Sequence, residues 1–256
     1  RVTVATNGGG SVATANGNVG CWHTLPTSRF MMLCSECNKI VRPVVAVDID
    51  GTLGDFHRHF MTFATGYLQG RPSLSPPQYT GIRSMRDWFC AEFGVDVRVW
   101  RDIKLAYRQG GMKRTMPSYG YGHKLTKACH ELGAEVWVTT TRPYLRLDNI
   151  DPDTRFWLDN NGIQFDGLIY DEFKYRLLLD NVGEGRVVAV LEDLPNEWED
   201  AAVLFGSDVP ILYRAAHNAY YWDQIPRNQQ VHEGETAWRR IQERILEWEE
   251  AHARVC

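Results

Sequence analysis

Two aspartates, Asp48 and Asp50, directly follow a run of apolar residues and offer the chemistry of phosphoryl transfer. Residues two apart share a face of a strand, and a turn begun by Gly51 lets both carboxylates reach one site. One can attack phosphorus while the other handles the proton of the leaving group. A hard cation such as Mg²⁺ would offset the crowded negative charge, so the pair predicts a metal-assisted phosphoryl-transfer site.

The apolar run before these aspartates, residues 44–47, has the composition of a central strand in a parallel sheet. Open α/β sheets bind ligands at the carboxyl ends of such strands, which is where the two carboxylates lie. Strands that alternate with helices indicate an α/β fold with right-handed crossovers. The other predicted strands are 135–140, 167–170, 186–191 and 211–213, and a helix is predicted at 153–160.

A mainly helical insertion is predicted at 55–131, where aromatic and charged residues recur with helical spacing around a Pro-rich loop at 71–77. We expect it to form a cap over an α/β core made of residues 43–54 and 132–256. The core ends in an amphipathic helix at 236–253, whose apolar face packs inward. That face comprises Trp238, Ile241, Ile245 and Trp248.

Composition narrows the class of protein. With 256 residues and 44% hydrophobic content, the chain can bury a substantial core. No stretch approaches the roughly 18 uninterrupted apolar residues of a membrane span, and the start lacks the order of a secretory signal. We therefore expect a cytoplasmic protein without a membrane partner. A net charge of −4 argues against nonspecific nucleic-acid binding and favours a small phosphorylated substrate. A homodimer is compatible with this composition.

Residues 1–42 form a leader in two parts. Residues 1–20 are almost uncharged and lack large side chains, which predicts a flexible tail. Residues 21–42 contain four potential zinc ligands, and a Cys-x-x-Cys followed by Asn-Lys has the shape of a zinc knuckle. Two interpretations stay open, a structural Zn²⁺ site or free cysteines in an unstructured leader. The four ligands are Cys21, His23, Cys34 and Cys37.

Polar residues also follow two later predicted strands. The segment Thr140-Thr141-Arg142 offers hydroxyls and backbone amides that can hold a phosphoryl oxygen. Glu192 and Asp193 offer oxygen ligands for a hard cation. Hydrolysis of phosphate monoesters can require accelerations of up to about 10²¹, whereas one general acid supplies typically about 10²–10⁴. A nucleophile, an acid, a cation and a phosphate-binding group must therefore act together. Because candidates for these groups follow strands of one parallel sheet, we predict that they meet at its carboxyl edge.

The motif Asp48-x-Asp50-Gly-Thr, followed in order by these later groups, resembles the haloacid dehalogenase (HAD) superfamily of phosphatases. The resemblance implies a Rossmann-like core of three layers, with a parallel sheet and a cap inserted after the first motif. It implies that Asp48 forms an aspartyl-phosphate and that Asp50 acts as acid and base. It also implies Mg²⁺ held by Asp48, Asp50 and Asp193, with Glu192 as a secondary ligand. The implied phosphate-binding residues are Thr140, Lys174, Thr141 and Arg142.

Within that superfamily, most of residues 44 to 250 resembles the 5'(3')-deoxyribonucleotidases. Gly54-Asp55-Phe56 is similar to that family's Ala-Asp-Phe, and segment 87–94 is similar to a cap segment whose tryptophan lines the sugar and base pocket. Ala216-His217-Asn218 and the Trp-containing last helix resemble the family's closing segment. The resemblance implies a (deoxy)nucleotide substrate, and aromatic stacking on a base contributes about 1–3 kcal/mol. The expected pocket residues are Phe56, Trp88 and Tyr107.

Two alternatives stay open. Segment 153–166, with Thr140-x-Arg142, resembles the phosphatase domain of bacteriophage polynucleotide kinase, which removes 3'-phosphates from nucleic-acid ends. A helical cap favours a small enclosed substrate over a polymer end. The other alternative is a catalytically inactive, zinc-bearing binding module on the same scaffold, against which the charge cluster argues. Some charged residues are either further phosphate contacts or solvated charges: His57, Lys113, Arg114 and Arg146.

Overall fold

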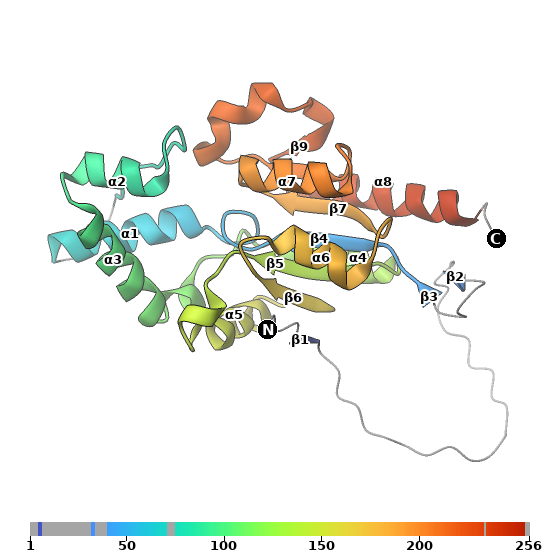
Figure 1. Ribbon diagram of the computed structural model, residues 1–256, viewed down its shortest axis with the longest axis horizontal. Helices are drawn as coiled ribbons and strands as arrows, with labels where there is room; N and C mark the ends of the chain where they lie inside the picture. The colour runs from blue at the N-terminus through green and yellow to red at the C-terminus, as the bar shows by residue number, and fades with distance from the viewer. Residues whose placement is uncertain (1–4, 7–31, 34–39, 71–74, 233, 254–256) are drawn as a thin grey trace, which may run out of the picture.

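The computed structural model describes residues 5–6, 32–33, 40–70, 75–232 and 234–253. Its main sheet has the strand order β1-β6-β5-β4-β7-β8-β9 (Figure 1). The neighbours from β6 to β9 pair in parallel, whereas β1 pairs antiparallel with β6. The strands of this sheet are β1 (Ala5–Thr6), β4 (Val44–Asp48), β5 (Glu135–Thr140), β6 (Gly167–Tyr170), β7 (Val187–Glu192), β8 (Pro210–Tyr213) and β9 (Gln230–Val231). A separate antiparallel pair is formed by β2 (Met32–Leu33) and β3 (Ile40–Val41).

Helices cover both faces of this sheet, which confirms the predicted three-layer α/β fold. One face packs against α4, α5 and α8, and the other packs against α6 and α7. The α-helices are α1 (Phe56–Gln69), α2 (Met85–Phe93), α3 (Val97–Gln109), α4 (Gly122–Glu131), α5 (Ile150–Asn160), α6 (Lys174–Val182), α7 (Pro195–Phe205) and α8 (Gly234–Ala253). The 3₁₀ segments are η1 (Met112–Thr115), η2 (Tyr144–Arg146), η3 (Ala216–Gln224) and η4 (Arg227–Gln229).

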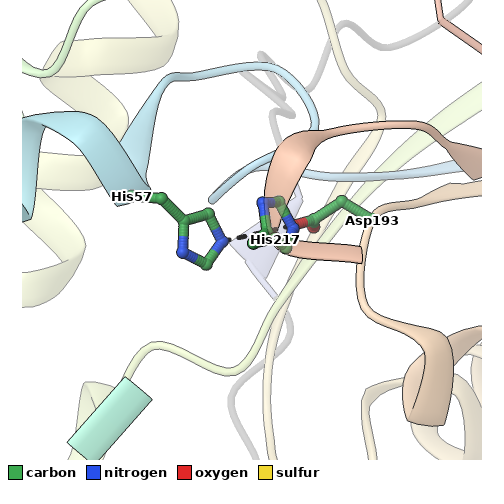
Figure 2. A group of neighbouring side chains, drawn as sticks. All are labelled: His57, Asp193 and His217. Atoms are coloured by element: carbon green, nitrogen blue, oxygen red, sulfur yellow. Dashed lines mark ion pairs between the residues drawn. The ribbon is translucent and has the colours of Figure 1, made fainter. Parts of the chain in front are cut away.

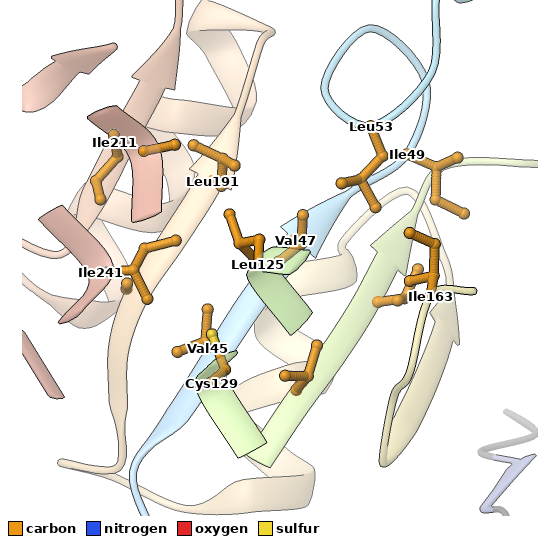
Figure 3. Packing of buried hydrophobic residues seen from close by; sticks show 14 of the residues in the cluster. Val45, Val47, Ile49, Leu53, Leu125, Cys129, Ile163, Leu191, Ile211 and Ile241 are labelled. Atoms are coloured by element: carbon orange, nitrogen blue, oxygen red, sulfur yellow. The ribbon is translucent and has the colours of Figure 1, made fainter. Parts of the chain in front are cut away.

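The central strand β4 is buried along its whole length, as its apolar composition predicts. Val45 and Val47 join the core cluster on the α4, α5 and α8 side (Figure 3). Val44 and Ala46 join the cluster on the opposite side, under α6 and α7. Side chains alternate along a strand, so β4 contributes to both cores and its last residue is held in a rigid position.

The last helix, α8, includes the whole predicted segment and begins two residues earlier, at Gly234. Ile241, Ile245 and Trp248 of its predicted apolar face lie in the same cluster as β4 and β5, and Trp238 packs against that cluster. The prediction of a core-packing terminal helix is therefore confirmed. None of the described helices is long and apolar enough to cross a membrane.

Helices α1, α2 and α3 lie to one side of the sheet, beyond the carboxyl end of β4 (Figure 1). They share an apolar cluster of their own, built from Phe60 and Met61 of α1, Phe89 of α2, and Trp100 and Ile103 of α3. This cluster lies within the predicted cap. The predicted cap range of 55–131 also takes in α4, whose Leu125 and Cys129 pack in the core.

The leader is described in part. Ala5 and Thr6, within the predicted flexible tail, pair as β1 with Leu168 and Gly167 at the edge of the sheet. The backbone hydrogen bonds that an edge strand leaves open explain why two residues can pair there. The four predicted zinc ligands lie outside the described residues: Cys21, His23, Cys34 and Cys37.

Candidate active site

Three carboxylates meet at the carboxyl edge of the sheet. β4 ends at Asp48, in register with Thr139 of β5. β7 ends at Glu192, and Asp193 follows it. Asp48, Glu192 and Asp193 are all buried, and each offers an oxygen within 4.8 Å of the others. Buried carboxylates this close repel one another unless cations compensate them, so the edge is built for positive charge.

The turn after β4 brings the chain close to Asp193. The amides of Leu53 and Gly54 both donate to the carbonyl of Ile49, at 3.0 and 2.9 Å. Gly51 within this turn has a φ of 110°, and a Cβ there would lie 2.0 Å from Asp193 Oδ2. Only glycine combines that backbone conformation with that approach. The sequence pattern Asp-x-Asp-Gly is thus a requirement of the turn as well as of its chemistry.

Lys174, the first residue of α6, supplies the buried positive charge. Its ammonium donates to Asp48 Oδ1 and to Glu192 Oε2, both at 2.6 Å. The Lys174 side chain is 1% exposed. Burial disfavours its charge, but the two carboxylates outweigh that cost and raise the pKa of Lys174 well above its usual value. Lys174 therefore stays protonated and holds Asp48 at the strand end.

Both oxygens of Glu192 are already engaged. Oε1 accepts from the backbone amides of Asp193 and Leu194, each at 3.0 Å. Oε2 accepts from Lys174 and from the Tyr175 hydroxyl, at 2.6 and 2.5 Å. Glu192 thus closes the turn after β7 and anchors Lys174. This leaves Asp48 and Asp193 as the carboxylates with fewer competing partners for a cation.

Asp50 lies between two cations. Arg142 donates a bidentate pair of hydrogen bonds to Asp50, from Nε to Oδ2 at 3.0 Å and from Nη2 to Oδ1 at 2.6 Å. Lys113 of η1 donates to Oδ2 at 2.5 Å. Burial opposes ionisation of Asp50, but the two cations outweigh it and hold the pKa of this carboxyl well below its usual range. Burial lowers the pKa of Lys113 to about 7.

Three consecutive threonines, Thr139 and Thr140 at the end of β5 and Thr141 after it, differ in their surroundings. Thr139 and Thr140 are buried, and Thr140 Oγ1 accepts from the amide of Arg142 at 3.3 Å. Thr139 Oγ1 is buried without a hydrogen-bond partner among the described residues. Thr141 is exposed and lines the cavity over the site, as Arg142 also does. Predicted phosphate-binding Thr141 and Arg142 are therefore in the cavity wall, and Thr140 lies just behind it.

Asp193 contacts two histidines that lie far apart in the sequence (Figure 2). Its Oδ2 is 2.6 Å from Nε2 of His217 in η3 and 3.4 Å from Nε2 of His57 in α1. Its Oδ1 accepts from the Thr52 hydroxyl at 3.1 Å. Burial acts to raise the pKa of Asp193, but the histidine contacts outweigh it and hold the pKa well below its usual range.

A cavity of about 290 Å³ opens over Asp48 and Asp50. Four cationic side chains line it: Lys104, Arg108, Lys113 and Arg142. Lys104 and Arg108, both on α3, form no ion pair with any described residue, and burial lowers the pKa of Lys104 to about 8. Sequence reasoning did not single out either residue. Their spacing of four on a helix with aromatic neighbours was a signal, because that spacing puts both side chains on one face.

Two of the three predicted aromatic pocket residues, Phe56 and Tyr107, line this cavity. Lys113 Nζ lies 3.8 Å from the centre of the Phe56 ring, so one face of that ring already contacts a cation. The Tyr107 hydroxyl is 2.8 Å from Nδ1 of His59. Trp88 does not line the cavity. It packs in the α1–α3 cluster and contacts Tyr79, whose ring centre is 5.6 Å away.

Two further predicted phosphate contacts point elsewhere. Arg114 donates to Asp153 at 2.6 Å and lies over Phe156, and Arg146 pairs with Glu172 at the surface. Both arginines are exposed, as the solvated alternative predicts.

Comparison with known proteins assigns the fold. No protein-family model matches the sequence, and no curated protein is detectably similar to it in sequence. A predicted phosphatase from Clostridium acetobutylicum superposes with a TM-score of 0.53 at 13% identity, over 79% of this chain and 99% of its own. A HAD hydrolase of family IA, variant 3, from Entamoeba histolytica gives 0.53 at 16% identity, over 78% and 99%. A haloacid dehalogenase-like family hydrolase from Streptococcus pneumoniae gives 0.52 at 14% identity, over 77% and 96%.

The fold is that of HAD hydrolases. These neighbours are described as phosphatases or hydrolases, and their descriptions name no nucleotide substrate. The likeness therefore shows the fold alone and leaves the HAD superfamily and its nucleotidase branch as proposals.

Proposed function

We propose that this chain is a phosphomonoesterase in which Asp48 is the nucleophile. The observation that carries this proposal is the buried contact of Asp48 with Lys174, 2.6 Å away, beside Glu192 and Asp193 on a HAD fold. Apolar residues of similar volume would stabilise the fold about as well as a buried lysine between two carboxylates does. Its position at the cavity floor is better explained by chemistry on a dianionic phosphoryl group.

In the first step, an oxygen of Asp48 attacks phosphorus and the ester P–O bond breaks. Asp50 donates a proton to the departing oxygen. In the second step, Asp50 removes a proton from water, the water oxygen attacks the phosphoryl group, and the bond to Asp48 breaks. Inorganic phosphate leaves, and both aspartates return to their starting states.

Asp50 must be protonated to act as an acid, although Arg142 and Lys113 favour its ionised form. A phosphoryl group that enters the cavity offers these two cations an alternative dianionic partner. As they turn toward the substrate, the pKa of Asp50 rises, because the charges that depressed it are now shared. Substrate binding and activation of the acid are thereby coupled.

The carboxylate group also fits Mg²⁺, which favours oxygen ligands and often takes only one or two carboxylates from the protein. The fit is supported by three buried carboxylates that a single lysine only partly compensates. Asp48, Asp193 and the backbone carbonyl of Asp50 would hold the ion. Bound there, Mg²⁺ would supply charge neutralisation at the phosphoryl oxygens.

For the substrate, we propose a (deoxy)nucleoside monophosphate. The aromatic side chains Phe56 and Tyr107 in the cavity wall support an aromatic base. The cavity of about 290 Å³ is at the small end of ligand sites, which fits a monomer better than a polymer end. A second candidate follows from Lys104 and Arg108. These two cations have no ion-pair partner among the described residues, which favours a phosphate ester that carries another anionic group such as a carboxylate.

The nucleophile is tested with p-nitrophenyl phosphate and purified full-length protein. We expect turnover with MgCl₂ that falls by at least about 10³-fold in Asp48→Asn, because covalent catalysis is lost. The matched control is Asp102→Asn, an exposed aspartate on α3, which should keep turnover within about twofold of the wild type. Near-normal turnover of Asp48→Asn would refute the mechanism, whereas no turnover by the wild type would favour the inactive-module alternative.

The substrate class needs a separate screen. Nucleoside 5'- and 3'-monophosphates, phosphorylated carboxylic acids and a 3'-phosphorylated oligonucleotide are compared by kcat/KM. We expect a nucleoside monophosphate to be preferred. Preference for a phosphorylated acid would favour the second candidate, and hydrolysis of the oligonucleotide but of no free nucleotide would overturn the monomer assignment.

A further inference from the structure

The two histidines at Asp193 lie on separate elements yet meet face to face. The rings of His57 and His217 are stacked with centres 3.7 Å apart, and Tyr79 continues the stack (Figure 2 shows the histidines). Asp193 is fully buried, His217 is 5% exposed and His57 is 15% exposed. One nitrogen from each ring and one oxygen of Asp193 lie within 4.8 Å of one another. This cluster differs from the carboxylate group of the proposed reaction, although it shares Asp193 with it.

Two histidine nitrogens of this cluster lie within ion-pair distance of an Asp193 oxygen, but none of the three atoms makes a well-aligned hydrogen bond. Within the described part of the chain, His57 Nε2, His217 Nε2 and Asp193 Oδ2 are buried and make no hydrogen bond of acceptable geometry. Leaving a buried polar atom unsatisfied costs about 1–3 kcal/mol. Three such atoms lie together here, so we expect a bound partner that interacts with all of them. Protonation of both rings is a poor answer, since two stacked imidazolium ions 3.7 Å apart would repel each other.

A single cation satisfies all three atoms. Two ligands each about 2.1 Å from one ion stand roughly 3.4 Å apart at a tetrahedral angle. The observed separations of Asp193 Oδ2 from the two nitrogens are 2.6 and 3.4 Å. To admit an ion, His217 must move away from Asp193, and the two stacked rings must turn so that both nitrogens aim at it. Both histidines also line two cavities, which provides an entry path and room for a further ligand.

The backbone around the cluster is held in place. Asn218 donates to the carbonyls of Asp193 and Tyr213, at 2.7 and 2.8 Å, and its own oxygen accepts from Ala215 at 2.9 Å. These bonds tie η3 to the end of β7 and fix His217 beside Asp193. On the other side, Asp55 caps the first turn of α1, which carries His57. The ligands are thus presented by anchored backbone, as a metal site requires.

We propose that His57, Asp193 and His217 form a second metal site, selective for a divalent transition ion such as Zn²⁺. Two imidazoles and one carboxylate are a donor set that Zn²⁺ and its neighbours favour, whereas Mg²⁺ favours oxygen. Three protein ligands leave a coordination position for water or a substrate oxygen. Because one ligand comes from α1 and two come from the core, the bound ion would also link the cap helix to the sheet.

Metal binding is tested on untagged full-length protein that carries Cys34→Ser and Cys37→Ser, so that the predicted leader site cannot contribute. The protein is freed of metal, placed in excess Mg²⁺ and titrated with Co²⁺, whose visible absorption reports ligand geometry. We expect one equivalent per chain and displacement by Zn²⁺. His57→Ala and His217→Ala should each weaken Co²⁺ binding by at least about 10-fold. The matched control His123→Ala, an exposed histidine on α4, should bind as the parent does.

A second measurement keeps the test decisive if a histidine variant misfolds. X-ray absorption of the Zn²⁺-loaded parent counts imidazole ligands directly, and we expect two. Absence of Co²⁺ binding in excess Mg²⁺, binding that survives both histidine substitutions, or fewer than two imidazoles would overturn the proposal. These readouts do not require turnover, so this site can fail while Asp48 proves to be the nucleophile, and the reverse.

Discussion

Replacing Lys174 by methionine probes the charge balance on which the proposed chemistry depends. Methionine keeps the length of the side chain but removes the ammonium that lies 2.6 Å from both Asp48 and Glu192. Two buried carboxylates then face each other with their shared cation gone. Removing one partner of a buried ion pair costs about 3–5 kcal/mol, because the remaining charge stays buried without compensation.

We therefore expect Lys174→Met to lower the free energy of unfolding by about 3–5 kcal/mol at pH 8 in the absence of metal ions. The matched control is Lys127→Met. Lys127 is 67% exposed and pairs with Glu131 at 3.5 Å on the same helix. Exposed pairs of this kind contribute about 0.3–0.5 kcal/mol, so the control variant should unfold almost as the wild type does.

The loss should also depend on pH in a defined direction. Burial already raises the pKa of Asp48, and removal of Lys174 raises it further. A carboxyl whose folded-state pKa exceeds its unfolded value of about 4 favours folding at low pH and loses that contribution as pH rises through the folded pKa. The stability difference between variant and wild type should therefore be largest at pH 8 and shrink toward pH 5.

Urea unfolding followed by circular dichroism, at several pH values, measures both effects. A loss below about 1 kcal/mol at pH 8, or a loss that does not change with pH, would refute the view that Lys174 compensates two ionised carboxylates. Mg²⁺ should restore part of the stability of Lys174→Met, because a bound cation compensates the same oxygens.

Two further predictions concern the cavity and the turn beneath it. Because burial lowers the pKa of Lys104 to about 8, KM for a phosphate ester should rise between pH 7 and pH 9 as this charge is lost. Lys104→Arg should flatten that rise, and an unchanged pH profile would count against a role for this charge. Gly51→Ala should abolish turnover and lower the melting temperature, because its Cβ would lie 2.0 Å from Asp193 at a φ of 110°. Gly94→Ala, with open space at a φ of 60°, should keep turnover, and equal activity of both variants would contradict the packing argument.

The strands, and the order in which the site residues follow them along the chain, could be predicted from sequence because both depend on local patterns. The strands predicted at 135–140 and 167–170 have the observed bounds, and the strand at 186–191 is displaced by one residue. Long apolar runs ending in polar residues have few alternatives in an α/β chain, so Asp48, Thr140 and Asp193 could be assigned to strand ends. Helix α4 was harder, because its sequence continues that of the predicted cap and only its packing against the core separates it.

The charges around the site could not be predicted in the same way. Lys113 reaches Asp50 across 63 residues, and His217 reaches Asp193 from a 3₁₀ segment without a regular pattern. A lysine or histidine in such a segment has the same local sequence whether it faces solvent or a buried carboxylate. The outcome depends on how α1, η1 and η3 dock, which is a sum of many nonlocal contacts.

The sequence alone determined that this chain forms a parallel α/β sheet with two aspartates at the end of its central strand. Local composition is sufficient to predict this arrangement. Because β4 is apolar and buried up to its end, the carboxylates lie at the carboxyl edge of the sheet. Tertiary structure decided how cations meet the aspartates. It paired Lys174 with Asp48, placed Lys113 and Arg142 on Asp50, and stacked two distant histidines on Asp193. Buried charge is costly without a partner, so the folded chain assembles the partners from wherever its packing allows.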